Sequence, residues 1–201
     1  TAGSDYTSTS GTLTFSAGDS SKTISVTVAN DNLDEANETA TITLSNASGA
    51  GTSDATGSLT ITDDDATPTI SINSSASVTE GDSGTSTQNM TVTQSAASGR
   101  DVTFNYAITG GTASSADFTA DSGTLTISAG DTTKTIPVII KGDTTEEGTT
   151  AETVAVTISN ATNASISGTS IGTVSISDND GLNLGTTASY NSSDETTLQS
   201  S

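Results

Sequence analysis

The chain has 201 residues, with 24 Asp and Glu residues against 4 Lys and Arg residues, and it contains no His and no Cys. The missing side chains exclude Ser-His and Cys-His nucleophilic pairs, an imidazole general base, and zinc or iron-sulfur sites built from those ligands. The formal net charge of −20 would repel phosphate backbones, so we expect no nucleic-acid partner.

An internal repeat organises the chain. Residues 10–19 read SGTLTFSAGD, and residues 122–131 read SGTLTISAGD. Farther along, residues 38–47 (ETATITLSNA) match residues 152–161 (ETVAVTISNA). Self-similarity over this length indicates two copies of one structural module.

The two copies differ in extent. Residues 63–65 (DDD) close the first copy and residues 178–180 (DND) close the second. Residues 69–111 of the second copy have no counterpart in the first, so we expect the first copy to lack its opening strands. We interpret the chain as residues 1–66, the C-terminal part of a first domain truncated at its N-terminus; residues 67–180, a complete second domain; and residues 181–201, a polar linker or tail.

Apolar and polar residues alternate in short segments of this second, complete copy. In chain order the segments centre on residues 70–72, 90–92, 102–108, 125–127, 136–140, 154–158 and 174–176. A period of two in a background rich in Thr and Val predicts half-buried strands. About seven strands in roughly 110 residues predict an all-β antiparallel sandwich of two sheets. The Ala-Gly-Asp steps at 17–19 and 129–131 predict hairpin turns.

Carboxylates gather at the ends of these predicted strands. They are Glu80, Asp117, Asp143, Glu146, Glu147, Glu152, Asp178 and Asp180 in the complete copy, and Asp5, Asp31, Asp34, Glu35, Glu38, Asp63, Asp64 and Asp65 in the first copy. If the loops meet at one end of the sandwich, mutual repulsion would raise pKa values and strain the fold. Calcium, which takes about 6 to 8 oxygen ligands in flexible geometry, would relieve that repulsion. No EF-hand is present, because no Glu closes a twelve-residue loop after residue 178.

Several short motifs accompany the acidic residues. Residues 78–81 read VTEG, residues 110–113 read GGTA, residues 116–118 read ADF (GSDY at residues 3–6), residues 122–125 read SGTL, and the acidic run closes each copy. Together these motifs resemble the Calx-beta domain, the calcium-binding module of sodium/calcium exchangers and of many long bacterial surface proteins. The resemblance extends to about residue 180 and implies tandem immunoglobulin-like sandwiches with calcium at one apex.

The resemblance also implies a set of calcium ligands. They are Glu80, Asp117, Asp143, Glu146, Glu152, Asp178 and Asp180 in the complete copy, and Asp5, Asp31, Asp34, Glu38, Asp63, Asp64 and Asp65 in the first copy. Glu35 and Glu147 are expected beside the ligands or in solvent. Lys141 stands where the family tends to carry further Asp residues, and it would replace one calcium by pairing with a neighbouring carboxylate. Surface or turn roles are expected for Asp19, Asp54, Asp101, Asp121, Asp131 and Asp194.

These features predict a non-enzymatic, calcium-binding repeat that serves as a structural or adhesive stalk segment of an extracellular or cell-surface protein. Its expected partners are calcium ions, neighbouring repeats of the same chain and a cell-surface or matrix ligand. No run reaches the roughly 18 apolar residues of a membrane span. The alternatives are a calcium-sensing regulatory module of a transporter or attached enzyme, and a passive acidic spacer without specific metal binding.

Overall fold

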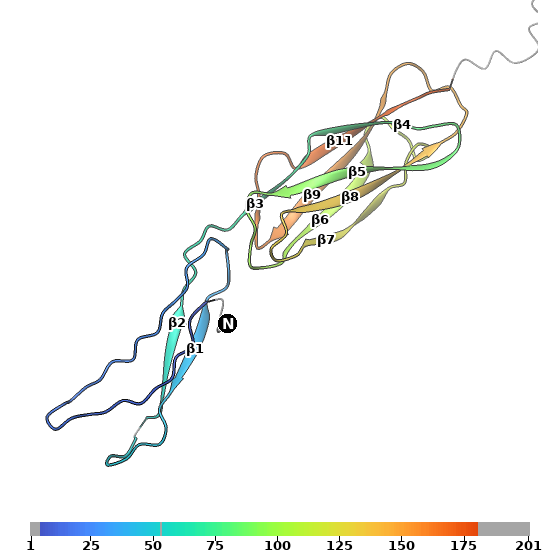
Figure 1. The fold of residues 1–201 in the computed structure, drawn as a ribbon. Coiled ribbons are helices and arrows are strands. Elements are labelled where there is room, and N and C mark those ends of the chain that lie inside the picture. Colours follow the sequence, from blue (N-terminus) through green and yellow to red (C-terminus); the bar gives the residue numbers. More distant parts are fainter. Residues whose placement is uncertain (1–4, 53, 181–201) are drawn as a thin grey trace, which may run out of the picture.

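The computed structural model describes residues 5–52 and 54–180, which form two β-rich parts joined end to end (Figure 1). The predicted linker or tail at residues 181–201 lies outside the described residues. The described residues contain no helix, and therefore none that is long and apolar enough to cross a membrane. Their strands are β1 (Glu38–Thr43) and β2 (Thr56–Ile61) in the first copy, and β3 (Thr69–Ile72), β4 (Ser75–Thr79), β5 (Gly84–Gln94), β6 (Val102–Gly110), β7 (Asp121–Ile127), β8 (Thr133–Gly142), β9 (Glu152–Thr162), β10 (Ser165–Ile166) and β11 (Ile171–Ser177) in the complete copy.

The complete copy is a sandwich of two sheets. One sheet has the strand order β10-β3-β5-β8, and the other has the order β4-β11-β9-β6-β7. Most neighbours are antiparallel, but β10 pairs with β3 and β11 pairs with β4 in parallel. The predicted all-β sandwich fold is confirmed.

The sequence predicts about seven strands, whereas the described residues 67–180 form nine. The short strands β4 and β10 account for the difference. Between β3 and β4, the Asn73 side chain accepts a hydrogen bond from Thr91 N (2.7 Å) and donates one to Ser75 O (3.0 Å). These bonds end β3 and allow the chain to cross to the opposite sheet.

The core lies between the two sheets and consists of the inward-facing residues of the predicted alternation. Phe104, with no exposed surface, packs there with Ile, Val and Met residues from both sheets. Burial of these apolar side chains is the main favourable term that holds the sandwich together. It fixes the strand ends from which the acidic loops project.

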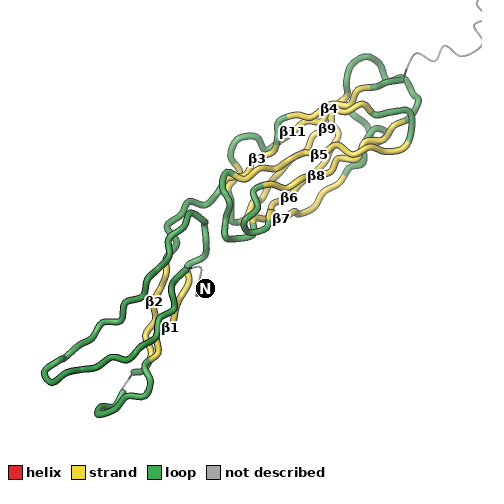
Figure 2. Tube along the Cα trace, viewed as in Figure 1, coloured by secondary structure: helices red, strands yellow, loops and turns green. Residues whose placement is uncertain are grey.

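The first copy is a partial sandwich. Its strands β1 and β2 pair in antiparallel register, while residues 7–28 run as two extended arms without regular strand pairing (Figure 2). The arms correspond in the repeat to β7 and β8, whose partners β6 and β5 have no counterpart in residues 1–66. Phe15 on one arm is consequently 57% exposed. The truncation of the first copy and the domain boundaries at residues 1–66 and 67–180 stay predictions.

Candidate metal centre

Two parallel strands bring the first group of carboxylates together. Glu80 directly follows β4, and Asp178 directly follows β11. Because β4 and β11 run in parallel, with Thr79 opposite Ser177, both chains leave the sheet at the same edge. Asp180, two residues farther, completes a trio in which one carboxylate oxygen from each residue lies within 4.8 Å of the others.

Within the trio of Glu80, Asp178 and Asp180, the pKa of one carboxyl group is lowered and that of another is raised. Asp178 accepts hydrogen bonds from Asp180 N (2.6 Å) and Glu147 N (2.8 Å), which lower its pKa. Glu80 is only 5% exposed; burial, followed by the charges of Asp178 and Asp143, raises the pKa of Glu80 to about 7. The folded chain thus fixes one anion with backbone amides and places a second carboxyl against it.

A second trio lies beside the first. It consists of Asp117 from the loop between β6 and β7, Glu147 from the loop after β8, and Glu152 at the start of β9, again with one oxygen of each within 4.8 Å of the others. Desolvation, the Asp117 charge and the Glu80 charge raise the pKa of Glu147 to about 7. Because Glu80 acts on Glu147, the two trios form one electrostatic unit.

Asp117 anchors the second trio. It is 2% exposed, and its Oδ2 accepts a 2.6 Å hydrogen bond from Ser114 N. Desolvation opposes ionisation of Asp117, but hydrogen bonds from Ser114 lower its pKa overall. Its neighbour Glu152 has a raised pKa, owing to desolvation first and then to the contact with Asp117. This trio therefore also contains a stabilised anion facing a carboxyl that resists ionisation.

Both trios contain buried oxygens that no protein donor satisfies. Among the described residues, Glu80 Oε1, Asp117 Oδ1, Glu152 Oε2 and Asp180 Oδ2 are buried without a hydrogen-bond partner. Such atoms cost free energy unless a donor or a cation meets them. A hard cation would satisfy these oxygens and neutralise the repulsion, so the donor set fits an oxygen-liganded divalent metal.

Lys141 does not play the predicted part. Its ammonium donates to the Ser115 carbonyl at 2.6 Å, and within the described part of the chain it forms no ion pair with a carboxylate. The reason lies in the backbone: Lys141 N donates to Asp117 O at 2.8 Å, which sets the lysine beside the loop of residues 114–117, where the carbonyl is available. The Lys141 ammonium therefore does not neutralise a carboxylate of either trio.

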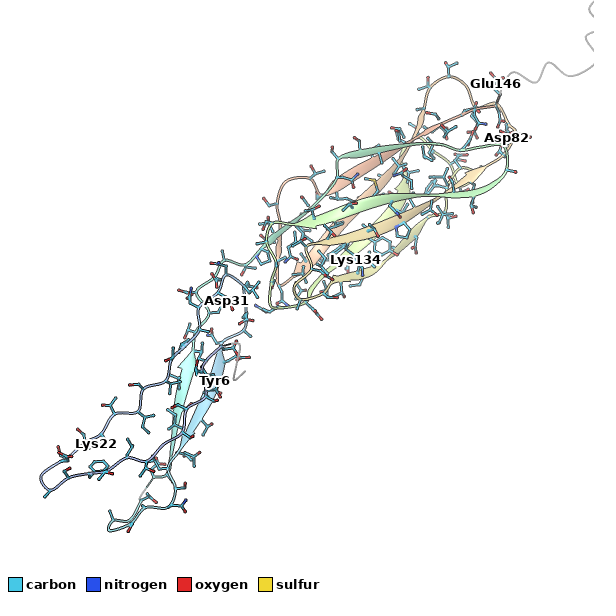
Figure 3. The ribbon with its side chains drawn as sticks, viewed as in Figure 1. Tyr6, Lys22, Asp31, Asp82, Lys134 and Glu146 are labelled. Carbon is cyan, nitrogen blue, oxygen red and sulfur yellow. The ribbon has the colours of Figure 1, made fainter. Side chains whose placement is uncertain are left out.

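The structure separates the remaining predicted ligands of the complete copy. Asp143 lies close enough to the first trio to raise the pKa of Glu80 and of Asp180, after desolvation in each case. Glu146 is exposed at the outer loop and belongs to neither trio (Figure 3). Its neighbour Glu147, expected beside the ligands or in solvent, supplies the trio oxygen instead.

Asp82 was missed at the sequence level. Its Oδ1 accepts a 2.6 Å hydrogen bond from Asn179 Nδ2, while Asn179 Oδ1 accepts one from Gly81 N at 2.8 Å. Asp82 also contributes, after desolvation, to the raised pKa of Asp180. The available signal was its position immediately after the VTEG motif at residues 78–81.

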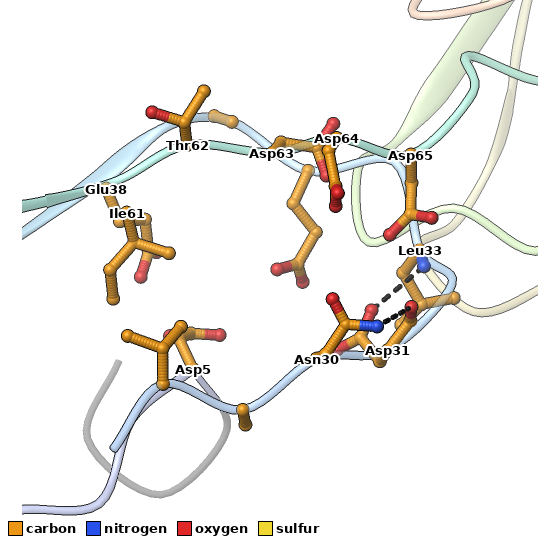
Figure 4. A pocket seen from close by; sticks show the side chains of 14 residues that line it. Asp5, Asn30, Asp31, Leu33, Glu38, Ile61, Thr62, Asp63, Asp64 and Asp65 are labelled. Atoms are coloured by element: carbon orange, nitrogen blue, oxygen red, sulfur yellow. Dashed lines mark hydrogen bonds between the residues drawn. The ribbon is translucent and has the colours of Figure 1, made fainter. Parts of the chain in front are cut away.

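The first copy holds a more open acidic hollow of about 90 Å³ (Figure 4). Its acidic lining residues are Asp5, Asp31, Glu35, Glu38, Asp63, Asp64 and Asp65. Desolvation and then the neighbouring carboxylates raise the pKa of Glu35 and of Asp65. Asp34, a predicted ligand, is absent from this lining and is directed to the complete copy. Carboxylate trios as tight as those above occur, among the described residues, only in the complete copy.

The sequence matches a known protein family. Two segments of the chain, residues 1–65 and residues 63–180, match the sequence model of the Calx-beta domain. The chain belongs to the Calx-beta family. The resemblance read from the sequence motifs is thereby confirmed.

Solved structures share the fold of this Calx-beta chain. The crystal structure of the apo form of the Calx CBD1 domain aligns with a TM-score of 0.51 and 19% identity over 57% of this chain and 100% of that domain. The calcium binding domain CBD12 of CALX1.1 aligns with a TM-score of 0.50 and 20% identity, over 55% of this chain and 46% of that one. The match thus spans about half of the latter structure. No curated protein sequence matches the chain.

Proposed function

We propose that this Calx-beta chain is a calcium-binding repeat that serves as a structural or adhesive stalk segment of an extracellular or cell-surface protein. The observation that carries the metal assignment is the set of buried, partnerless carboxylate oxygens in the two trios. Stability of the metal-free chain does not explain these oxygens, because each buried oxygen without a partner lowers that stability.

Calcium suits this centre better than magnesium. The donors are carboxylates, and they come from separate loops rather than from one rigid element. Calcium accepts 6 to 8 oxygens at about 2.3–2.6 Å in variable geometry, whereas magnesium demands a near-ideal octahedron and retains water. Glu80, Asp178 and Asp180 would hold one part of the metal centre, and Asp117, Glu147 and Glu152 would hold the other.

The stalk role rests on the arrangement of the copies. They lie end to end (Figure 1), and only Ala66, Thr67 and Pro68 separate the closing acidic run of the first copy from β3. Metal bound among Asp63, Asp64 and Asp65 would neutralise carboxylates at the joint. Extracellular calcium modules bind at about 10⁻⁴ to 10⁻³ M, which is suited to an open site such as the acidic hollow.

Calorimetry of the full chain in EDTA, in about 5 mM calcium and in about 5 mM magnesium tests the metal assignment. At the dissociation constants above, linkage predicts that calcium stabilises the folded chain by about 1–2 kcal/mol. Glu152→Gln should lose most of this gain, while Asp131→Asn, on an exposed turn, should keep it. No stabilisation by calcium would reject the metal centre and leave a passive acidic spacer.

A calcium titration separates the stalk from the regulatory alternative. Submillimolar to millimolar affinity is expected of a stalk segment, while micromolar affinity would favour a calcium-sensing module attached to a transporter or enzyme.

A further inference from the structure

The acidic loop of the first copy contacts one turn of the complete copy. Gly99 N donates to Asp34 O at 3.1 Å, and Ser98 Oγ donates to the same carbonyl at 3.0 Å. Asp34 and Ser98 also form an isolated parallel β-bridge. Two segments more than sixty residues apart in sequence therefore meet through backbone pairing as well as through side chains.

The Asp34 carboxylate is enclosed in this contact. It is 4% exposed. Its Oδ1 accepts a 3.0 Å hydrogen bond from Thr67 Oγ1 in the link, and its Oδ2 lies 3.4 Å from Ser98 Oγ and 3.8 Å from Arg100 Nη1. Unlike the four buried trio oxygens without partners, both Asp34 oxygens are satisfied by protein groups, and a buried carboxylate with such partners stabilises the contact that supplies them.

The turn at residues 98–100 is held in place from within the complete copy. Gly130 N donates to Ser98 O at 2.9 Å. The Arg100 guanidinium donates to Asn163 Oδ1, and Asn163 Nδ2 donates to Asp101 O at 2.9 Å. Because these bonds order the turn independently of the first copy, it presents a preformed surface rather than one created by docking.

The two loops also fit closely at Gly99. A Cβ atom on Gly99 would lie 2.6 Å from Glu35 Cγ, so the close approach of the two loops depends on the missing side chain. The first copy thus meets the complete copy with a carboxylate against Arg100 and with a side chain over a glycine.

We propose that residues 98–100 form a docking socket for the acidic loop of the preceding copy, and that Asp34 is the plug that holds the two copies in a fixed orientation without metal. The matching partner is another copy of the same module. In the repeat, residues 31–35 (DNLDE) align with residues 143–147 (DTTEE), so Glu146 stands at the position of Asp34. Glu146 is exposed and is available to the socket of a further copy. This contact between Asp34 and residues 98–100 is separate from the calcium centre proposed above.

The absence of cysteine from the sequence permits a direct test. Thr60→Cys in β2 and Thr135→Cys in β8 place labels at exposed positions of the two copies. Double electron–electron resonance on the spin-labelled full chain should give one narrow distance peak in EDTA, and calcium should leave its position unchanged. Asp34→Ala should abolish the narrow peak in EDTA, whereas Asp131→Asn, an equal charge change at the same end of the complete copy, should preserve it.

Asp34→Ala could broaden the peak by unfolding the first copy, so two variants in the complete copy test the same contact from the other side. Ser98→Ala removes the donor to Asp34, and Gly99→Val inserts a side chain against Glu35; both should broaden the distribution in EDTA. A narrow peak in both variants would overturn the proposal, as would a peak in the parent chain that is broad in EDTA and narrow only in calcium. The latter result would leave the calcium proposal intact. If the parent chain gives a narrow peak in EDTA but calorimetry shows no stabilisation by calcium, calcium binding is rejected and the contact between Asp34 and residues 98–100 is supported.

Discussion

Glu80→Gln should stabilise the metal-free protein and abolish much of its response to calcium. Burial and the Asp178, Asp143 and Asp180 charges raise the pKa of Glu80 to about 7 from the ordinary 4.5. One pKa unit corresponds to about 1.4 kcal/mol. Without solvent screening, ionisation of Glu80 would therefore lower the free energy of unfolding by ~3 kcal/mol. Solvent screening at the loop end reduces this to about 1–2 kcal/mol. A neutral glutamine of the same shape avoids that cost.

The sign of the pH dependence follows from the same pKa. Between pH 4.5 and about 7 the folded chain keeps a proton on Glu80 that the unfolded chain has lost. The free energy of unfolding of the metal-free chain therefore has its full Glu80 contribution below pH 4.5 and loses it as the pH rises through about 7. Calcium reverses this trend, because it binds the ionised form.

Calorimetry in EDTA at pH 8 and pH 5 measures both effects. At pH 8, Glu80→Gln should raise the unfolding midpoint of the complete copy by about 3–8 °C. At pH 5 the variant and the parent should nearly coincide, because Glu80 is then protonated. With calcium at pH 8, the parent chain should have the higher unfolding midpoint. A lower midpoint for the variant in EDTA at pH 8, or an equal gain at both pH values, would refute the repulsion argument.

Two further substitutions test the placement of the acidic loop and of the core. Glu147→Gln should remove most of the calcium-induced rise in the unfolding midpoint, whereas Glu146→Gln, one residue away and outside both trios, should retain it; equal effects would contradict the assignment of Glu147. Phe104→Ala, at a position with no exposed surface, should lower the free energy of unfolding by about 3–5 kcal/mol in urea titrations, and a loss below about 1 kcal/mol would contradict the position of the core.

The fold was largely accessible from the sequence, because alternation of apolar residues records which side of each strand is buried. The long strands β5, β6, β8 and β9 all fall on such runs. The crossing at Asn73 and the two-residue strand β10 were not accessible. Both depend on hydrogen bonds to residues distant in sequence, and neither has enough apolar residues to show a period.

The sequence located the acidic loops but did not select their inward-facing residues. In each copy two adjacent carboxylates follow the same strand: Asp34 with Glu35, and Glu146 with Glu147. The second of each pair contributes to the acidic cluster of its own copy, while the Asp34 carboxylate is enclosed at the contact with the complete copy. For Asp34 this orientation depends on the contact at residues 98–100, which a single module's pattern does not contain.

The parallel pairing of β4 with β11 also determines how the complete copy would carry tension. β4 lies near the start of the copy and β11 at its end, and five residue pairs hold them in register from Ser75 opposite Thr173 to Thr79 opposite Ser177. A pull on the two ends would slide these strands past each other, so their hydrogen bonds would be loaded in shear and would have to fail together instead of unzipping singly. A chain of such modules would resist extension at each sandwich, and its weakest point under load would lie between the copies, where a few contacts around Asp34 join them.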